Sequence, residues 1–517
     1  MSETILAVHT GHNAAAAVYH NNDFIILELE RLLNYKNASW SSFRPTYSAP
    51  FIADFVYNFL KERYGITHYN KLIVGELSDE VSQEFKDAIP ADEYAGDYTH
   101  HAAHIYGSFC QSNFTHAIGV SYDGGGIDGS FNLYELERGK EPTLIALQDY
   151  DLGSYYHTLG LICEDIKNTD GLVIAGKLLG LQSYGNVVED WIEAFRDYFR
   201  SPKPYWQNLD QKLQKLSDTI GIAFSAQNKL AGQLSYDFAK TGQYAFEQVA
   251  FELMDKTISE YDLPIVVSGG CALNIVMNTK IKEKYSQEVF IAPNSTDVGL
   301  AFGYLCKHVK PELAVDITYK GVPVLDKYTL LEYIDSRYGA KVELNAIVED
   351  LANNRILGVV QGNAEHGPRA LGNRSIICSP ISPDMKDILN FKVKHREWFR
   401  PFAPIVRLED VSEYFEWEGE SRWMNFCPKV KPEYIDKIPA VVHVDGTARV
   451  QTVTREQNSF IYDLLTEFKA KTGIGVLVNT SFNVDGKPIL STYKDAFKVF
   501  DETQLDRLYL DGYYFRK

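Results

Sequence analysis

The chain has 517 residues, of which 51 are Lys or Arg and 69 are Asp or Glu, so its formal charge is −18. This length predicts roughly two to four domains, and a hydrophobic content of 45% is typical of a globular protein. No run of about 18 apolar residues suggests a membrane span, and the first residues lack a signal-peptide pattern. The six cysteines are scattered without a C-x-x-C pair. We therefore expect a cytoplasmic protein with no membrane partner, no disulfide framework and no zinc–thiolate site.

Short apolar runs that lead into turns predict buried strands in the first part of the chain. These predicted strands are 5–8, 14–19, 24–27, 71–75, 117–121 and 263–267. Between them, residues 49–64 have helical spacing, and one face of that helix carries Phe51, Phe55, Phe59 and Leu60. Strands mixed with helices in this way predict an α/β fold with functional sites at strand ends.

A second unit is predicted beyond residues 311–326, which contain glycine and proline, show no strong periodicity and are typical of a linker. Apolar strands are predicted in this unit at 356–360 and 475–479. We therefore predict two domains, 1–325 and 340–517. No low-complexity segment or short-period repeat is visible in the sequence.

Two histidines in the segment HHAAH have the spacing of a metal site on a helix. His100 and His104 are four residues apart, so they project from one helical face. A borderline or hard metal would also need carboxylates. Asp123, which precedes three glycines, and Asp297 are the candidates. The alternative interpretation is that both histidines only cap or pack a helix.

His12 lies in the turn Gly11-His12-Asn13 after the first predicted strand. An imidazole has an unperturbed pKa close to neutrality, so it can serve as a general base. The alternative is a histidine that only bonds the backbone of its turn.

Two glycine-rich turns follow predicted strands, and backbone N–H groups in such turns favour phosphate or nucleotide. They contain Gly124 and Gly125, and Gly269 and Gly270, the latter pair followed by Asn274. Neither turn matches a Walker A or Rossmann fingerprint, and tight turns also need glycine for their own geometry. Lys177, between two glycines in GKLLGL, is either an anion contact or a solvated helix residue.

The C-terminal part concentrates arginines and lysines in stiff loops. The segment EHGPRALGNRS holds Arg369 and Arg374, and KHREWFRPFAP, DGTARVQTV and NTSFN follow it. Arginines in fixed geometry bind phosphate oxygens two at a time. A basic cluster inside an acidic chain therefore predicts a local anionic ligand, and the alternative is a set of surface ion pairs.

Together these motifs resemble the carbamoyltransferase family of nodulation and antibiotic-tailoring enzymes, the NodU/CmcH-type O-carbamoyltransferases. The resemblance covers nearly the whole chain and rests on nine segments in order: GHNAAAA, HHAAH, SYDGGG, GKLLGL, SGGCALN, EHGPRALGNRS, KHREWFRPFAP, DGTARVQTV and NTSFN. It implies an ASKHA-type (TsaD-like) N-terminal domain followed by a YrdC-like α/β C-terminal domain. The YrdC-like domain would form carbamoyladenylate from carbamoyl phosphate and ATP with Mg²⁺. The TsaD-like domain would transfer the carbamoyl group to an acceptor hydroxyl and release AMP.

The resemblance also implies roles for individual residues. The metal ligands, around Fe²⁺ or another divalent ion, would be His100, His104, Asp123 and Asp297. His12 would lie near the acceptor. Gly269, Gly270 and Asn274 would form the adenylate-binding turn, and Gly124, Gly125 and Lys177 are further candidates for cofactor binding. Carbamoyl phosphate and ATP would be bound and activated by Arg369, Lys394, Arg396, Arg400, Arg449, Asn479 and Ser481.

The identity of the acceptor stays open. A sugar, an antibiotic-type alcohol and a hydroxymethylpyrimidine, free or in DNA, all carry a suitable hydroxyl. The acidic charge argues mildly against a long duplex-DNA footprint, and a small-molecule acceptor, including a nucleotide, agrees with it better. A homodimer is a further option. The alternative functions are a tRNA threonylcarbamoyl-type transferase and a non-catalytic ASKHA nucleotide-binding protein.

Overall fold

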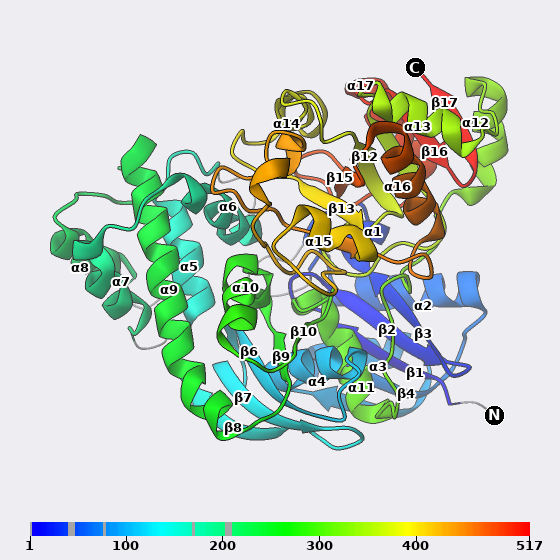
Figure 1. Cartoon of the computed structure of the whole chain (residues 1–517). Coiled ribbons are helices and arrows are strands. Elements are labelled where there is room, and N and C mark those ends of the chain that lie inside the picture. Colours follow the sequence, from blue (N-terminus) through cyan, green and yellow to red (C-terminus); the bar gives the residue numbers. More distant parts are fainter. Residues whose placement is uncertain (1–2, 40–46, 76–78, 168–170, 202–208) are drawn as a thin grey trace. The chain divides into compact units, whose positions relative to one another are not determined.

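The computed structural model describes residues 3–39, 47–75, 79–167, 171–201 and 209–517 (Figure 1). The chain forms two compact units. The first consists of Met1–Asn274 and Ile281–Gly321, and the second of Ile275–Lys280 and Val322–Lys517. Among the described residues, no helix has the length and apolar character needed to cross a membrane.

The first unit contains two five-stranded sheets with the same topology. In each sheet the first three strands are antiparallel neighbours, and two later strands add in parallel to the other side of the first one. The first sheet, ordered β3-β2-β1-β4-β5, is made of β1 (Ile5–His9), β2 (Ala15–His20), β3 (Asp23–Glu28), β4 (Tyr69–Gly75) and β5 (Ala91–Asp97). The second, ordered β10-β9-β6-β7-β8, is made of β6 (His116–Gly126), β7 (Gly129–Glu137), β8 (Thr143–Gln148), β9 (Ile265–Ser268) and β10 (Val289–Ile291). The predicted strands of this region are confirmed, and the duplication is a feature that no sequence repeat indicated.

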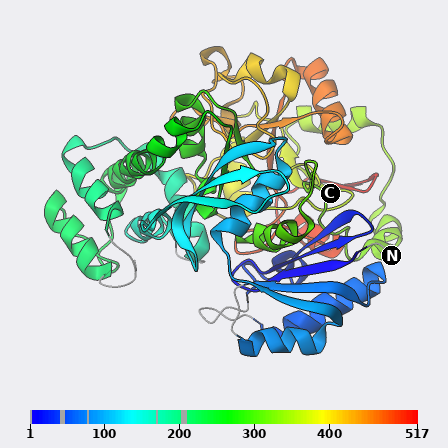
Figure 2. The same ribbon diagram turned by 90° about the horizontal axis from the view of Figure 1, so that it is seen from below.

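Helices α4 (His101–Gln111) and α11 (Leu300–Val309) lie between the two sheets (Figure 2). Apolar side chains from both helices and both sheets form one buried cluster. The helices approach closely because glycines face each other: a Cβ on Gly107 would lie 3.0 Å from the Cα of Gly303, and a Cβ on Gly303 would lie 2.1 Å from the carbonyl oxygen of Ala103. This core positions the N-terminal ends of both helices.

Helix α2 (Ala49–Tyr64) has the predicted bounds, between an N-cap at Ser48 and Gly65 with a φ of +70°. Of the four residues predicted to share one face, Leu60 is buried, and Phe51, Phe55 and Phe59 are partly or largely exposed. Ile52, Val56 and Leu60 are among the buried residues, whereas Phe51 is 43% exposed and belongs to a row of stacked rings with Phe55 and Phe59.

The first unit contains further helices outside the space between the two sheets. They are α1 (Leu29–Leu32), α3 (Asp79–Ala88), α5 (Leu152–Leu161), α6 (Ile174–Leu181), α7 (Ile192–Phe199), α8 (Leu209–Ile220) and α9 (Gly232–Glu260), with 3-10 turns η1 (Gly171–Val173), η2 (Gln182–Tyr184), η3 (Glu189–Trp191), η4 (Gly270–Leu273) and η5 (Asp297–Gly299). Helix α10 (Ile275–Lys284) contributes Ile275–Lys280 to the second unit.

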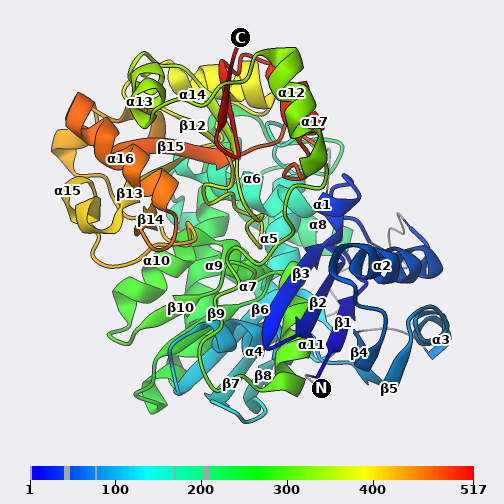
Figure 3. The same ribbon diagram turned by 90° about the vertical axis from the view of Figure 1, so that its right-hand side faces the viewer.

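The second unit is built on a seven-stranded mixed sheet, ordered β14-β13-β15-β12-β11-β16-β17 (Figure 3). Its strands are β11 (Leu357–Val360), β12 (Arg374–Cys378), β13 (Ala403–Arg407), β14 (Gln451–Val453), β15 (Val476–Ser481), β16 (Arg507–Leu510) and β17 (Tyr513–Arg516). The strands predicted at 356–360 and 475–479 are confirmed as β11 and β15. The observed sheets establish the mixed α/β class, while the TsaD-like and YrdC-like assignments stay predictions, as do the domain bounds 1–325 and 340–517.

The helices of the second unit are α12 (Leu330–Arg337), α13 (Leu344–Ala352), α14 (Met385–Asp387), α15 (Val411–Tyr414), α16 (Ser459–Thr472) and α17 (Tyr493–Glu502), with 3-10 turns η6 (Lys327–Thr329), η8 (Leu408–Asp410), η9 (Pro432–Tyr434) and η10 (Pro439–Val441). The segment η7 (Ile388–Lys394) is a π-helix, an uncommon element that is often found at functional sites.

Candidate functional site

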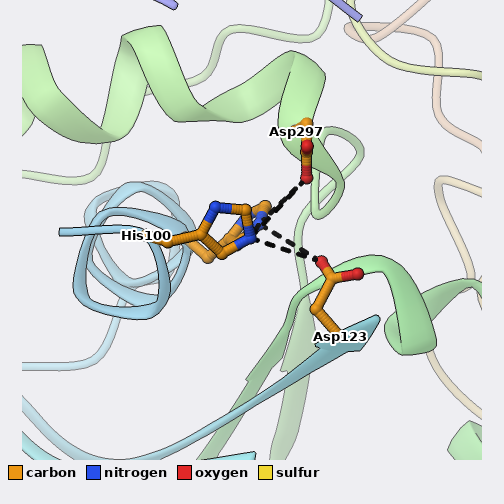
Figure 4. Close-up of side chains that lie close together, drawn as sticks. His100, Asp123 and Asp297 are labelled. Atoms are coloured by element: carbon orange, nitrogen blue, oxygen red, sulfur yellow. Dashed lines mark hydrogen bonds and ion pairs between the residues drawn. The ribbon is translucent and has the colours of Figure 1, made fainter. Parts of the chain in front are cut away.

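Four of the predicted residues meet at the N-terminal ends of α4 and α11. His100 and His104 come from the start of α4, Asp123 from β6, and Asp297 from η5 directly before α11. The Nε2 atom of His104 lies 3.1 Å from that of His100, and 3.3 Å from a carboxylate oxygen of each aspartate. His100 Nε2 lies 3.9 Å from the same two oxygens. Figure 4 shows the imidazole of His100 facing the carboxylates of Asp123 and Asp297.

These four side chains fit a divalent metal ion. One ligand atom from each lies within 4.8 Å of all the others. Metal–ligand bonds of about 2.1 Å place neighbouring donor atoms roughly 3.0–3.4 Å apart, and the distances at His104 lie in that range. Two imidazole nitrogens and two carboxylate oxygens suit several divalent first-row metals. The geometry does not select one of them.

The electrostatics of the cluster keep both carboxylates charged. Burial alone would raise the pKa of Asp297, but the neighbouring imidazoles of His12 and His104 lower it below its usual range. At Asp123, burial again acts to raise the pKa, but His100 and His104 hold it well below its usual range. The site is therefore ready to bind a cation without first losing carboxyl protons.

His12 reaches the same cluster through Asp297. Its Nδ1 atom lies 3.1 Å from Oδ2 of Asp297, whereas the other oxygen of that carboxylate faces His104. The His12 side chain is 48% exposed. With Nδ1 on the carboxylate, Nε2 is the ring nitrogen left for a proton from a substrate.

Sequence reasoning missed His9, a fully buried histidine of β1. Its Nε2 atom lies 4.0 Å from Asp297 Oδ2, and its ring would clash with a Cβ on Gly11 at 2.8 Å. A histidine at the end of an apolar strand gives no sequence signal for a contact with Asp297. That contact depends on the pairing of β1 with distant segments.

The predicted nucleotide turns lie against Asp123. The N–H of Gly270 donates to Oδ2 of Asp123 at 2.5 Å, and the N–H of Gly124 donates to Oδ1 at 2.6 Å. Gly269 has a φ of +91°, and a Cβ there would lie 2.2 Å from the carbonyl oxygen of Tyr122. In the structure, these two N–H groups therefore bind the carboxylate of Asp123. Gly125, with a φ of +121°, completes the turn.

Two other residues predicted to bind a cofactor, Asn274 and Lys177, have partners within the protein. The amides of Asn274 and Gln243 bond each other at 3.0 and 3.3 Å. Lys177 is buried, and its ammonium donates to the carbonyl of Lys167 at 2.8 Å. Their predicted role toward a nucleotide stays a prediction.

The second unit gathers four predicted arginines: Arg369, Arg396, Arg400 and Arg449. Burial, and then the charge of Arg400, lower the pKa of Arg369 to about 10. Burial followed by neighbouring arginines holds the pKa of Arg396 and of Arg449 well below the usual range. Only one ion pair to this cluster occurs among the described residues, between Arg400 and Glu397 at 3.7 Å. Such an excess of positive charge is typical of an anion site.

Individual arginines of this cluster differ in their partners. Arg396 is oriented by Asn390, which accepts from its Nε at 2.7 Å, and by the ring of Phe402 at 4.4 Å. In the part of the chain that the structure describes, Arg369 makes no side-chain hydrogen bond or ion pair, and the buried Nε of Arg449 has no partner. Unpaired donors of this kind suit phosphate oxygens.

The loop before β12 owes its shape to Glu365. One of its carboxylate oxygens accepts from the N–H groups of Leu371, Asn373 and Arg374 at 2.7–3.0 Å. Arg374 itself is buried and donates to three backbone carbonyl oxygens. Of the two arginines in EHGPRALGNRS, only Arg369 therefore joins the cluster.

Three further predicted residues have well-defined internal bonds. Lys394, at the end of η7, donates to the carbonyl and hydroxyl oxygens of Ser481 and to two oxygens of Asn483, at 2.6–3.2 Å. Asn479 donates to Ala370 and Gln451 at 3.0 and 2.6 Å. These bonds hold β15 and its following turn in place, and they leave the ligand roles of Lys394, Asn479 and Ser481 as predictions.

Comparison with known proteins gives matches along most of the chain. Residues 13–306 match a family model described as carbamoyltransferase N-terminus, and residues 348–517 match one described as carbamoyltransferase C-terminus. Nodulation protein NolO of Bradyrhizobium diazoefficiens is 32% identical over 452 residues, which cover 81% of this chain and 78% of that protein. Nodulation protein U of Sinorhizobium fredii is 27% identical, with 81% and 78% covered. The crystal structure of T. kodakarensis HypF matches with a TM-score of 0.37, 15% identity, and 61% and 49% covered, a likeness too low to carry an argument.

Proposed function

The chain belongs to the carbamoyltransferase family, and we propose that it is an ATP-dependent O-carbamoyltransferase with two reaction centres. The observation that carries this proposal is the set of four donors from His100, His104, Asp123 and Asp297, with His12 bonded to one of them. The C-terminal unit forms carbamoyladenylate, and the N-terminal unit transfers its carbamoyl group to a hydroxyl. The domain types implied by the resemblance, TsaD-like and YrdC-like, belong to this proposal.

The arginine cluster supports adenylate formation in the second unit. Carbamoyl phosphate and water give carbamate and phosphate, and a carbamate oxygen then attacks the α-phosphorus of ATP and displaces pyrophosphate. Both steps move negative charge among phosphate oxygens, so fixed cations lower their barriers. Among the described residues, Arg369 makes no side-chain hydrogen bond or ion pair and the Nε of Arg449 has no partner, and Arg396 and Arg400 add charge beside them. Mg²⁺ would accompany ATP as part of the substrate.

The histidine–aspartate cluster supports the transfer step in the first unit. An iron(II)-type or other divalent ion, bound by His100, His104, Asp123 and Asp297, would polarise the carbamoyl carbonyl. Nε2 of His12 accepts the proton of the acceptor hydroxyl, while Asp297 holds the other nitrogen and stabilises the imidazolium that forms. The new bond joins the acceptor oxygen to the carbamoyl carbon, and the bond to AMP breaks.

The proposed acceptor is a small molecule with a hydroxyl group, such as a sugar, an antibiotic-type alcohol or a hydroxymethylpyrimidine nucleotide. The half-exposed His12 supports an acceptor that arrives from solvent. A tRNA threonylcarbamoyl-type transferase and a non-catalytic nucleotide-binding protein are the alternatives.

Pyrophosphate release from ATP, with and without carbamoyl phosphate, tests the first half-reaction. We expect release only with carbamoyl phosphate, loss of release in Arg449→Ala, and retained release in Asp123→Ala, because Asp123 serves only the transfer step. No release from folded, metal-loaded protein, with or without a mixture of candidate acceptors, would refute adenylate formation. Loss of release in a folded Asp123→Ala protein would refute the division into two centres.

A further inference from the structure

The helix that carries both metal-site histidines is not capped by its own N-cap residue. His100 occupies that position without a side-chain cap hydrogen bond. Instead, the carboxylate of Asp128 accepts from the N–H of His101 at 2.9 Å and from the N–H of Ala102 at 3.3 Å. Asp128 lies in the turn between β6 and β7, so it joins the first turn of α4 to the strand that carries Asp123.

The same turn also contacts the histidine ring. A Cβ on Gly126 would lie 2.8 Å from Cδ2 of His100, so the imidazole rests against the backbone of this turn. The pairing of β6 with β7 is irregular between Tyr122 and Gly126, and such bulges redirect side chains near functional sites. One short turn therefore contacts α4 through Asp128 and presents Asp123 to the same metal site.

A second connection joins α4 to the helix that follows Asp297. Asp97, at the end of β5, accepts from the N–H and hydroxyl of Thr99 at 2.9 and 2.6 Å. The ammonium of Lys307, on α11, donates to both oxygens of Asp97 at 2.9 and 3.2 Å and to the Thr99 hydroxyl at 2.8 Å. Asp97 is buried, and Thr99 directly precedes His100.

We propose that Asp128 and the Asp97–Lys307 pair are positioning residues of the metal centre. Asp128 sets the separation of the histidines from Asp123, and the pair sets their separation from Asp297. This inference rests on the metal centre of the proposed function. Its physical reason is that ligand atoms must be held within about 0.5 Å for tight metal binding, and each connection ties α4 to the element that supplies one of the two carboxylates.

Metal affinity distinguishes this role from ordinary helix capping. We would titrate Co²⁺ into chelator-treated protein and follow its absorption spectrum, alongside the melting temperature. Removing a partner that orients metal ligands costs about 10–100-fold in metal affinity. We expect a loss of that size for Asp128→Ala, a smaller loss for Asp128→Asn, which keeps one acceptor oxygen, and a loss for Lys307→Met.

Ser48→Ala is the matched control, because the Ser48 hydroxyl caps α2 by accepting from the N–H of Phe51 and that helix carries no proposed ligand. It should lose stability while its Co²⁺ affinity stays within about twofold of the unmodified protein. Unchanged affinity in folded Asp128→Asn and Lys307→Met proteins would overturn this inference alone. Absence of Co²⁺ binding by the unmodified protein would overturn the metal centre together with it.

Discussion

Replacing Arg369 by methionine should stabilise the ligand-free protein while removing its first half-reaction. Arg369 is partly buried and has the charge of Arg400 beside it. It makes no side-chain hydrogen bond or ion pair within the described residues. Methionine keeps much of the packing of the arginine stem and removes the charge. Arg369 should therefore lower the stability of the ligand-free protein, and it should be required when an anion is bound for the first half-reaction.

The size of the effect follows from the pKa of Arg369, which burial and then the charge of Arg400 lower from the ordinary arginine value to about 10. Since one pKa unit corresponds to about 1.4 kcal/mol, keeping this guanidinium charged in the folded state costs about 3 kcal/mol. The side chain is only partly buried, so we halve this figure to about 1.5 kcal/mol for solvent screening. The folded pKa is the lower one, so the cost is present throughout the pH range below 10 and fades above it. For a unit of this size, the gain should raise the melting temperature by roughly 3–6 °C.

Differential scanning calorimetry at pH 7.5, with and without pyrophosphate, measures both effects. We expect Arg369→Met to melt at a higher temperature than the unmodified protein without ligand, to gain less from pyrophosphate, and to release none from ATP. Arg455→Met is the control, because Arg455 is 64% exposed and, among the described residues, its one ion pair is with Asp463 at 3.3 Å. The stability of this variant should differ from that of the unmodified protein by less than about 0.5 kcal/mol. A lower melting temperature for ligand-free Arg369→Met, with normal pyrophosphate release, would refute this reasoning.

Three shorter predictions address the other residues. His12→Gln should reduce carbamoylation of an acceptor by about 10²–10⁴-fold and leave pyrophosphate release intact. Mass spectrometry of the acceptor measures the carbamoylation. Equal loss of carbamoylation and pyrophosphate release would contradict the role of His12. Burial lowers the pKa of His104, but Asp123 and Asp297 raise it above 6.5 overall. The resulting stabilisation of the folded state is complete below pH 6.5 and is lost as the pH rises through the raised pKa. The melting temperature of metal-free protein should therefore fall above pH 6.5. Loss of this pH dependence in a His104→Gln variant would identify His104 as the titrating group. Lys394→Met should lower stability by about 1–3 kcal/mol, because four oxygen atoms lose a donor; unchanged thermal unfolding would show that Lys394 is not structural.

Local patterns were sufficient for the elements themselves. Apolar runs before turns identified the strands of both units, and helical spacing predicted the observed range 49–64 of α2. That spacing placed Phe51, Phe55, Phe59 and Leu60 on one face, whereas the buried residues of the helix include Ile52, Val56 and Leu60. Which face is buried depends on where a sheet lies, and periodicity alone does not contain that information.

The duplication of the first unit shows the same limit on a larger scale. Its two sheets share one strand order and one pattern of parallel and antiparallel pairing, yet no repeat is visible in the sequence. Many apolar sequences satisfy the same alternation of buried and exposed positions. A shared topology therefore does not require a repeat that is visible in the sequence.

For the site, the sequence by itself determined which residue types were present and at which spacing: the i,i+4 histidines of α4, the aspartate before the glycines, and the arginines of the C-terminal loops. The sequence also offered Asp297 as a candidate ligand, but only the tertiary structure placed it beside histidines nearly 200 residues away. The structure also decided that Arg374 donates to backbone carbonyls, while Arg369 has no side-chain hydrogen bond or ion pair among the described residues. It also decided that Asp128 holds the ligand helix. The physical reason is that a short segment can specify its own hydrogen bonds and burial pattern, whereas the partner of a charged side chain is set by which distant strands and helices pack together.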